Sequence, residues 1–102
     1  MRFLFSLDFP HEPFNKHVRE GTAGQLIGRI VEDTKPESIY FTENDGHRGA
    51  VAVYNLEEDS QVAAICEPWF LSLNADCRIR IAMAVDDLGK AGLDTVGKKW
   101  PQ

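Results

Sequence analysis

Cysteine and histidine are scarce in this chain of 102 residues, and their scarcity excludes two classes of protein. Two cysteines, Cys66 and Cys77, are too few for a disulfide framework, and we expect free thiols in a reducing cytoplasm, with a single disulfide as the alternative. Two thiols bind zinc only together with histidines at ligand spacing, which His11, His17 and His47 do not provide. We therefore expect neither a metal nor another cofactor.

The sequence also lacks a long apolar run and an excess of positive charge. No apolar stretch approaches the roughly 20 residues that cross a bilayer. Asp8 and Pro10 close the apolar start without a small-residue cleavage site, which predicts a strand rather than a signal peptide. The 11 Lys and Arg are scattered among 16 acidic residues, giving a net charge of -5. Nucleic-acid binders gather Lys and Arg on one face, so we expect neither nucleic acid nor a membrane as partner.

What remains is an ordinary globular composition without repeats or a low-complexity linker, and we expect one domain over 1–102. Residues 2–9 alternate between apolar and polar, which is typical of a half-buried strand. Asp45-Gly46 predicts a tight turn between two further strands. Strands are thus predicted at 2–9, 38–43, 49–56 and 78–85, with helices over 11–33 and 60–74. This order, β-α-β-β-α-β, predicts an α+β fold with a four-stranded antiparallel sheet and helices on one face.

Breaks within the helical segments are also predicted. Gly21 ends a first helix and Thr22 to Gln25 match a capping box that starts a second, although a single bent helix is the alternative. Pro68 has no N–H, so it is expected to kink or restart the helix that contains it. A short helix capped by Asp86 and Asp87 and a helical segment up to Trp100 complete the chain. We expect this tail, residues 86–102, to pack on its own subunit or on a partner.

Strand alternation assigns residues to the two faces of the predicted sheet. The helix-covered face receives Phe3, Phe5, Leu7, Phe9, Val51, Val53, Ile79, Ile81, Met83 and Val85. The other face receives Leu4, Ser6, Asp8, Tyr40, Thr42, Ala50, Ala52, Tyr54, Arg78, Arg80, Ala82 and Ala84. A fully exposed face would carry more Lys, Glu and Thr, so this mixture suits contact with a second sheet. Identical subunits are the commonest source of such a sheet, and we expect a homodimer of facing sheets.

The chain combines the order of elements above with the Asp45-Gly46 hairpin, the segments Glu67–Phe70 and Asn74–Asp76, and Lys98-Lys99-Trp100. With these features it resembles a small bacterial family of unknown function. That family is similar to the dimeric α+β-barrel superfamily, whose subunits have the ferredoxin-like fold. The resemblance implies facing sheets, with ligands between the sheets or between sheet and helices. The superfamily includes cofactor-independent monooxygenases, lactone isomerases, haem-binding enzymes and regulatory modules, so the resemblance does not decide the function.

Arg78 and Arg80 are the leading candidate site residues. They project from one face of the last strand, and antiparallel pairing with the first strand brings Asp8 and Ser6 opposite them. Guanidinium groups bind planar oxyanions in pairs, which predicts a carboxylate pocket. A structural Arg–Asp pair that fixes the dimer interface is the alternative.

Tyr40 and Tyr54 are candidates for hydroxyl donors in the same space. Such tyrosines more often pack with the ring buried and the hydroxyl exposed to water. Two function hypotheses follow. The first is a small-metabolite-binding or regulatory module without catalysis. The second is a cofactor-independent enzyme, similar to a monooxygenase or an isomerase, that acts on a small aromatic or carboxylate-bearing metabolite. The sequence names no convincing acid or base, which favours the first.

Overall fold

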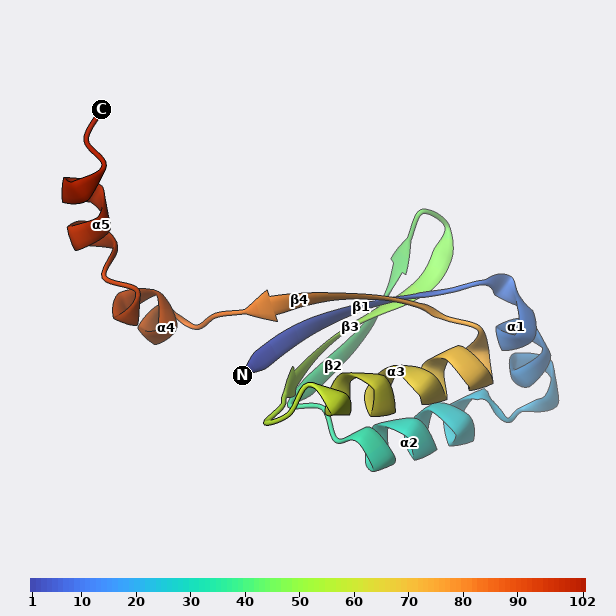
Figure 1. The fold of residues 1–102 in the computed structure, drawn as a ribbon. Helices are drawn as coiled ribbons and strands as arrows, with labels where there is room; N and C mark the ends of the chain where they lie inside the picture. The colour runs from blue at the N-terminus through green and yellow to red at the C-terminus, as the bar shows by residue number, and fades with distance from the viewer.

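A computed structural model describes residues 1–102 as a sheet-and-helix body followed by a tail that stands away from it (Figure 1). The strands are β1 (Arg2–Phe9), β2 (Ser38–Asn44), β3 (His47–Asn55) and β4 (Asp76–Ala82). The helices of the body are α1 (His11–Glu20), α2 (Ala23–Thr34) and α3 (Ser60–Leu73), and those of the tail are α4 (Val85–Lys90) and α5 (Leu93–Lys99). The strands form one antiparallel sheet in the order β2-β3-β1-β4. The predicted α+β class and ferredoxin-like arrangement are confirmed.

The core lies between the central strands and the helices. Phe5, Leu7 and Phe9 of β1 alternate toward the helix layer and are almost completely buried. Trp69 of α3 is fully buried against them, with its ring centroid 5.8 Å from that of Phe9. The alternation of β1 therefore predicted its buried face correctly. No helix is both long and apolar enough to cross a membrane.

The break between α1 and α2 falls where the sequence placed it, but its chemistry differs. Gly21 ends α1 with φ of 73°, a left-handed conformation that glycine adopts without strain. Thr22 precedes α2 without making a side-chain cap, so the predicted capping box is wrong. Its hydroxyl instead donates to the His17 carbonyl at 3.3 Å and lies 3.0 Å from Nδ1 of that histidine. The helix predicted to kink or restart at Pro68 does not restart there, because α3 continues through Pro68 to Leu73.

The assignment of β3 to the two sheet faces was wrong. Ala50 pairs with Leu7 and Ala52 with Phe5, so both alanines face the helices and are buried. Val51 and Val53 lie on the opposite face. The segment from Gly49 to Tyr54 alternates alanine with valine, and both are apolar enough for a core. The period of two was correct, but the choice between the faces depends on the helices, which approach the sheet closely over small side chains.

Tyr54 also lies on the helix side, contrary to its predicted place. It is 1% exposed and its ring contacts Phe5 edge-on at 4.9 Å. Its hydroxyl is 2.8 Å from Oγ1 of Thr34, which in turn donates to the Ile30 carbonyl at 2.9 Å. Burial raises the pKa of the Tyr54 phenol. Tyr54 is thus a core residue that ties the end of α2 to the sheet.

The last predicted strand ends earlier than expected. β4 stops at Ala82, so Met83 and Val85 lie beyond the sheet, and Val85 begins α4. Ile79 and Ile81 do face the helix side, but they are 37% and 59% exposed. β4 is an edge strand, and the helices do not cover its outer half. The apolar layer predicted for this face is therefore continuous only as far as the start of β4.

Cys66 and Cys77 are free thiols on neighbouring elements, α3 and β4. Cys66 is buried, and Cys77 is half-buried on the helix side of the sheet. Burial and the neighbouring Cys66 raise the pKa of Cys77 to about 12, from an ordinary value of 9.0. Burial raises the pKa of Cys66 as well.

We expect the free energy of unfolding to fall as the pH rises above 9. Below this pH the Cys77 thiol is protonated in the folded and in the unfolded protein, so its ionisation does not lower the free energy of unfolding. Between pH 9 and about 12 the thiol ionises in the unfolded chain before it does so in the folded protein, which favours unfolding. Urea titrations of the wild type and Cys77→Ala at increasing pH measure this effect. A decline just as steep in Cys77→Ala would assign the pH dependence to other groups.

Candidate functional site

The sheet face that no helix covers carries the predicted site residues except Tyr54, and we call it the open face. Antiparallel register places residues of alternate positions from all four strands on it. Its members are Arg2, Leu4, Ser6, Asp8, Ser38, Tyr40, Thr42, Asn44, His47, Gly49, Val51, Val53, Asn55, Asp76, Arg78, Arg80 and Ala82. The centre of the face is uncharged, and its charged residues lie along β4 and at the two ends of β1.

Two arginines from β4 stand side by side on the open face, as predicted. Arg78 lies opposite Ser6, and Arg80 lies opposite Leu4. Nη1 of Arg78 is 3.9 Å from Oδ2 of Asp8, a loose ion pair, and the Arg78 side chain is 73% exposed. Arg80 makes no ion pair. The structure thus brings Asp8 to one arginine and leaves the other free.

Asp8 is held in place by a residue that the sequence did not single out. Nδ2 of Asn44 donates to Oδ1 of Asp8 at 2.7 Å. Gly49 lies between them on β3, and a Cβ there would come within 3.1 Å of the Leu7 carbonyl oxygen. The missing side chain leaves space for the amide to reach across a strand. Because one oxygen of Asp8 is engaged by Asn44, its hold on Arg78 is weak.

The two tyrosines are separated by the sheet. Tyr40 is 73% exposed on the open face, in one row with Val51, Ser6 and Arg78. This row crosses all four strands, so three strand spacings of about 4.8 Å put Tyr40 about 14 Å from Arg78. Tyr54 is removed from the site because it faces the core. Tyr40 and the arginines therefore mark opposite margins of the open face.

The centre between these margins is more apolar than the sequence predicted. Leu4 pairs with Val53 across β1 and β3, and Val51 lies beside Ser6 and Tyr40. Leu4, Val51 and Val53 are half-buried by their neighbours within the single chain. Val51 and Val53 lie on the open face, where Ala50 and Ala52 were predicted. The apolar surface that this face exposes to water is therefore larger than expected.

Two hollows meet at Asp8 and Arg78. One, of about 510 Å³, lies at the end of the sheet and is also lined by Asn44, His47 and Asp76. The other, of about 250 Å³, is a shallow depression on the open face itself. The His47 ring stacks on His11 with 4.6 Å between centroids, a contact that joins the hairpin to the start of α1.

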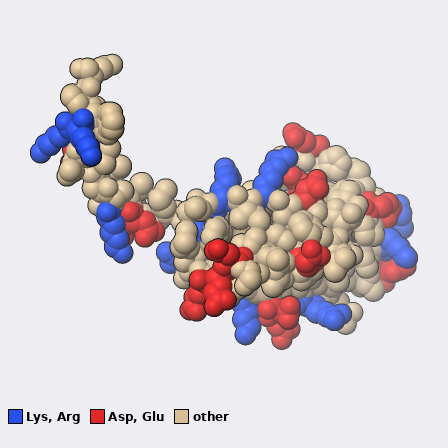
Figure 2. Space-filling model, viewed as in Figure 1, with Lys and Arg blue, Asp and Glu red and all other residues tan.

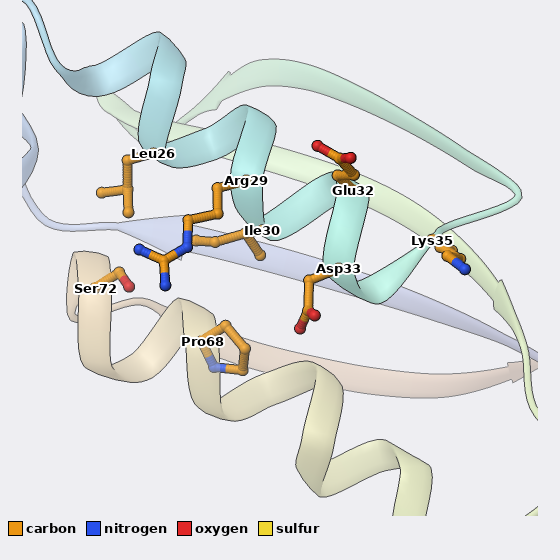
Figure 3. Close-up of a pocket in the computed structure, with 8 residues that line it drawn as sticks. All are labelled: Leu26, Arg29, Ile30, Glu32, Asp33, Lys35, Pro68 and Ser72. Carbon is orange, nitrogen blue, oxygen red and sulfur yellow. The ribbon is translucent and has the colours of Figure 1, made fainter.

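A larger hollow, of about 620 Å³, lies in the helix layer between α2 and α3 (Figure 3). In this view Arg29 and Asp33 project from α2 toward the helix that carries Pro68 and Ser72. Lys35 and Glu32 add charges of both signs to its rim. Because these charges offset one another, the groove favours no ligand of one sign, and we do not assign it a role. Figure 2 shows the same mixing of acidic and basic side chains over the visible side of the body.

Comparison with known proteins adds no function to this geometry. No family model matches the sequence. No curated protein matches it either. Among solved structures, the chain is similar to a de novo designed protein, Ferredog-Diesel, with a TM-score of 0.49 and 15% identity over 79% of this chain and 85% of that one. It is also similar to a formyltetrahydrofolate deformylase from Pseudomonas putida KT2440, with a TM-score of 0.48 and 8% identity. That match covers 80% of this chain but only 29% of the deformylase.

Proposed function

We propose that the chain is a homodimeric module, of the bacterial dimeric α+β-barrel type, that binds a small carboxylate-bearing metabolite between its facing sheets. The observation that carries the proposal is Arg80, a guanidinium without an ion pair beside the apolar Leu4.

The open face supports the dimer. Leu4, Val51 and Val53 form an apolar centre that no helix covers, and Tyr40 extends it to the margin of the sheet. Contiguous apolar surface on a sheet is typical of an interaction site, and its burial against a second sheet contributes about 25 cal/mol per Å². A second copy presents the same apolar centre, so the contact is self-complementary about a two-fold axis.

Dimerisation through this face makes a ligand anion favourable. Arg78 and Arg80 lose water when a second sheet covers them, and a desolvated guanidinium without a partner is strongly destabilising. Asp8 can neutralise only Arg78, and it does so weakly at 3.9 Å. A ligand carboxylate supplies the missing charge and fits the guanidinium fork with two parallel hydrogen bonds.

The same residues favour binding over catalysis. Arginine stays protonated at any ordinary pH, so Arg78 and Arg80 orient an anion but do not exchange protons with it. Ser6 and Tyr40 add hydroxyl groups that can donate to a bound ligand. These groups support a module that senses or holds a metabolite.

We expect benzoate to raise the melting temperature of the protein, and benzamide not to do so. The two compounds share ring and shape, but only benzoate carries a negative charge that can pair with the Arg80 guanidinium. Binding to the folded state alone stabilises it by about 2.7 kcal/mol at 100 times the dissociation constant, which a thermal melt detects readily. Larger aromatic acids and aliphatic oxo acids extend the panel. If no carboxylate in the panel shifts the melting temperature, the metabolite-binding proposal is refuted.

A further inference from the structure

The C-terminal tail projects from the body and does not pack on the sheet or on the other helices. It follows β4 and contains α4 and α5, and Figure 1 shows it leading away from the sheet and the other helices. The radius of gyration is 17.4 Å and the longest dimension is 60 Å. A compact domain of this length has a radius of gyration of about 13 Å. The excess reflects the displaced tail.

Each short helix of the tail has an apolar side, and we call the two sides together the tail stripe: Val85, Leu88, Leu93, Val96 and Trp100. Val85 and Leu88 in α4, and Leu93 and Val96 in α5, are three positions apart and so share a side of their helix, while Trp100 follows directly after α5. Val85 is 85% exposed and Trp100 is 75% exposed. Helices of 6 and 7 residues are not stable alone in water, because nucleation costs more than so few hydrogen bonds return. The tail stripe therefore needs a surface to pack on.

The connection to β4 directs the tail away from its own helices. Only Met83 and Ala84 separate the end of the strand from α4. Ala84 is extended, with φ of -77° and ψ of 168°, so the chain keeps the direction of β4 as it enters α4. Return to the helix layer of the same subunit requires a reversal at this short connection. A neighbouring subunit is reached without one.

The area of the open face leads to the same conclusion. Four strands spaced by about 4.8 Å, with seven residues rising about 3.3 Å each, present a flat area of about 440 Å². A stable interface buries about 800 Å² on each partner. The sheet alone supplies about half of this area, and the tail stripe is a further uncovered apolar surface that can contribute the rest.

We infer that each tail packs on a second copy of the chain, so that the two subunits exchange arms. This inference rests on the proposed dimer and adds to it the element that completes the interface. The surface that receives the arm is the apolar row at the β4 edge, Ile79 and Ile81, which their own subunit leaves 37% and 59% exposed.

The test uses the full chain with Val96→Asp, which places a charge in the tail stripe outside the core. Lys98→Asp, on the same helix but outside the stripe, is the control for added negative charge. We expect Val96→Asp to raise the dimer dissociation constant at least about tenfold by sedimentation, and Lys98→Asp to leave it nearly unchanged. Ile81→Asp at the receiving edge is expected to act like Val96→Asp.

Isotope-filtered nuclear Overhauser spectra of mixed dimers, one subunit labelled and the other not, locate the tail directly. We expect contacts between the Trp100 indole and the Ile81 methyl groups to appear between subunits. A dimer whose tail contacts only its own subunit overturns the arm exchange but leaves the proposed dimer intact. A full chain that remains monomeric refutes the dimer itself, and the two failures are thereby distinguished.

Discussion

Replacing Trp69 by alanine is expected to lower the free energy of unfolding by about 3 to 5 kcal/mol. Trp69 has no exposed surface and packs on the ring of Phe9 at the centre of the layer between β1 and α3. Removal of the indole leaves a cavity that neighbours on two rigid elements fill only in part. Urea denaturation monitored by far-UV circular dichroism measures the loss.

Two further variants separate packing from other effects. Leu71→Ala lies on the same helix but is 81% exposed, so it controls for helix propensity and is expected to change stability by less than about 0.5 kcal/mol. Trp69→Phe keeps an aromatic contact with Phe9 and removes the indole N–H, which is buried without a hydrogen-bond partner. We expect it to lose less than the alanine variant. Equal losses for Trp69→Ala and Leu71→Ala would contradict this account of the core.

The strands show which parts of the fold the sequence could predict. Phe5, Leu7 and Phe9 alternate with polar residues in β1, so pattern and burial agree there. In β3 both alternating sets are apolar, and only the closeness of the helices decides that Ala50 and Ala52 face inward. The end of β4 could not be predicted because Ile79, Ile81 and Met83 continue an apolar alternation beyond the point where pairing with β1 ends.

The candidate site shows the same division. Antiparallel geometry is regular, so the position of Arg78 near Asp8 followed from counting residues along two strands. The hydrogen bond from Asn44 to Asp8 crosses a strand over Gly49, and no local pattern signals a contact of that kind. Tyr54 was misplaced together with the rest of β3. Regular backbone geometry can thus be predicted, whereas side-chain contacts that depend on three elements at once require the structure.

The strongest test of the proposed function is the substitution Arg80→Gln. It keeps a long polar side chain on β4 but removes the charge that has no partner, and we expect it to weaken benzoate binding by about 10- to 100-fold. The estimate reflects a charged hydrogen-bond pair worth about 1.5 to 3 kcal/mol. Isothermal titration calorimetry of wild type and variant measures the dissociation constants directly.

Two controls make this test specific to the open face. Arg19→Gln removes an exposed arginine from α1, outside the open face, and should leave binding unchanged. Arg78→Gln is expected to have a smaller effect than Arg80→Gln, since Asp8 already offsets part of the Arg78 charge. If Arg80→Gln binds benzoate as tightly as the wild type while both variants stay dimeric, Arg80 serves the interface alone. In that case the ligand site must be sought elsewhere, beginning with the hollow that Asp8, His47 and Asp76 line at the end of the sheet.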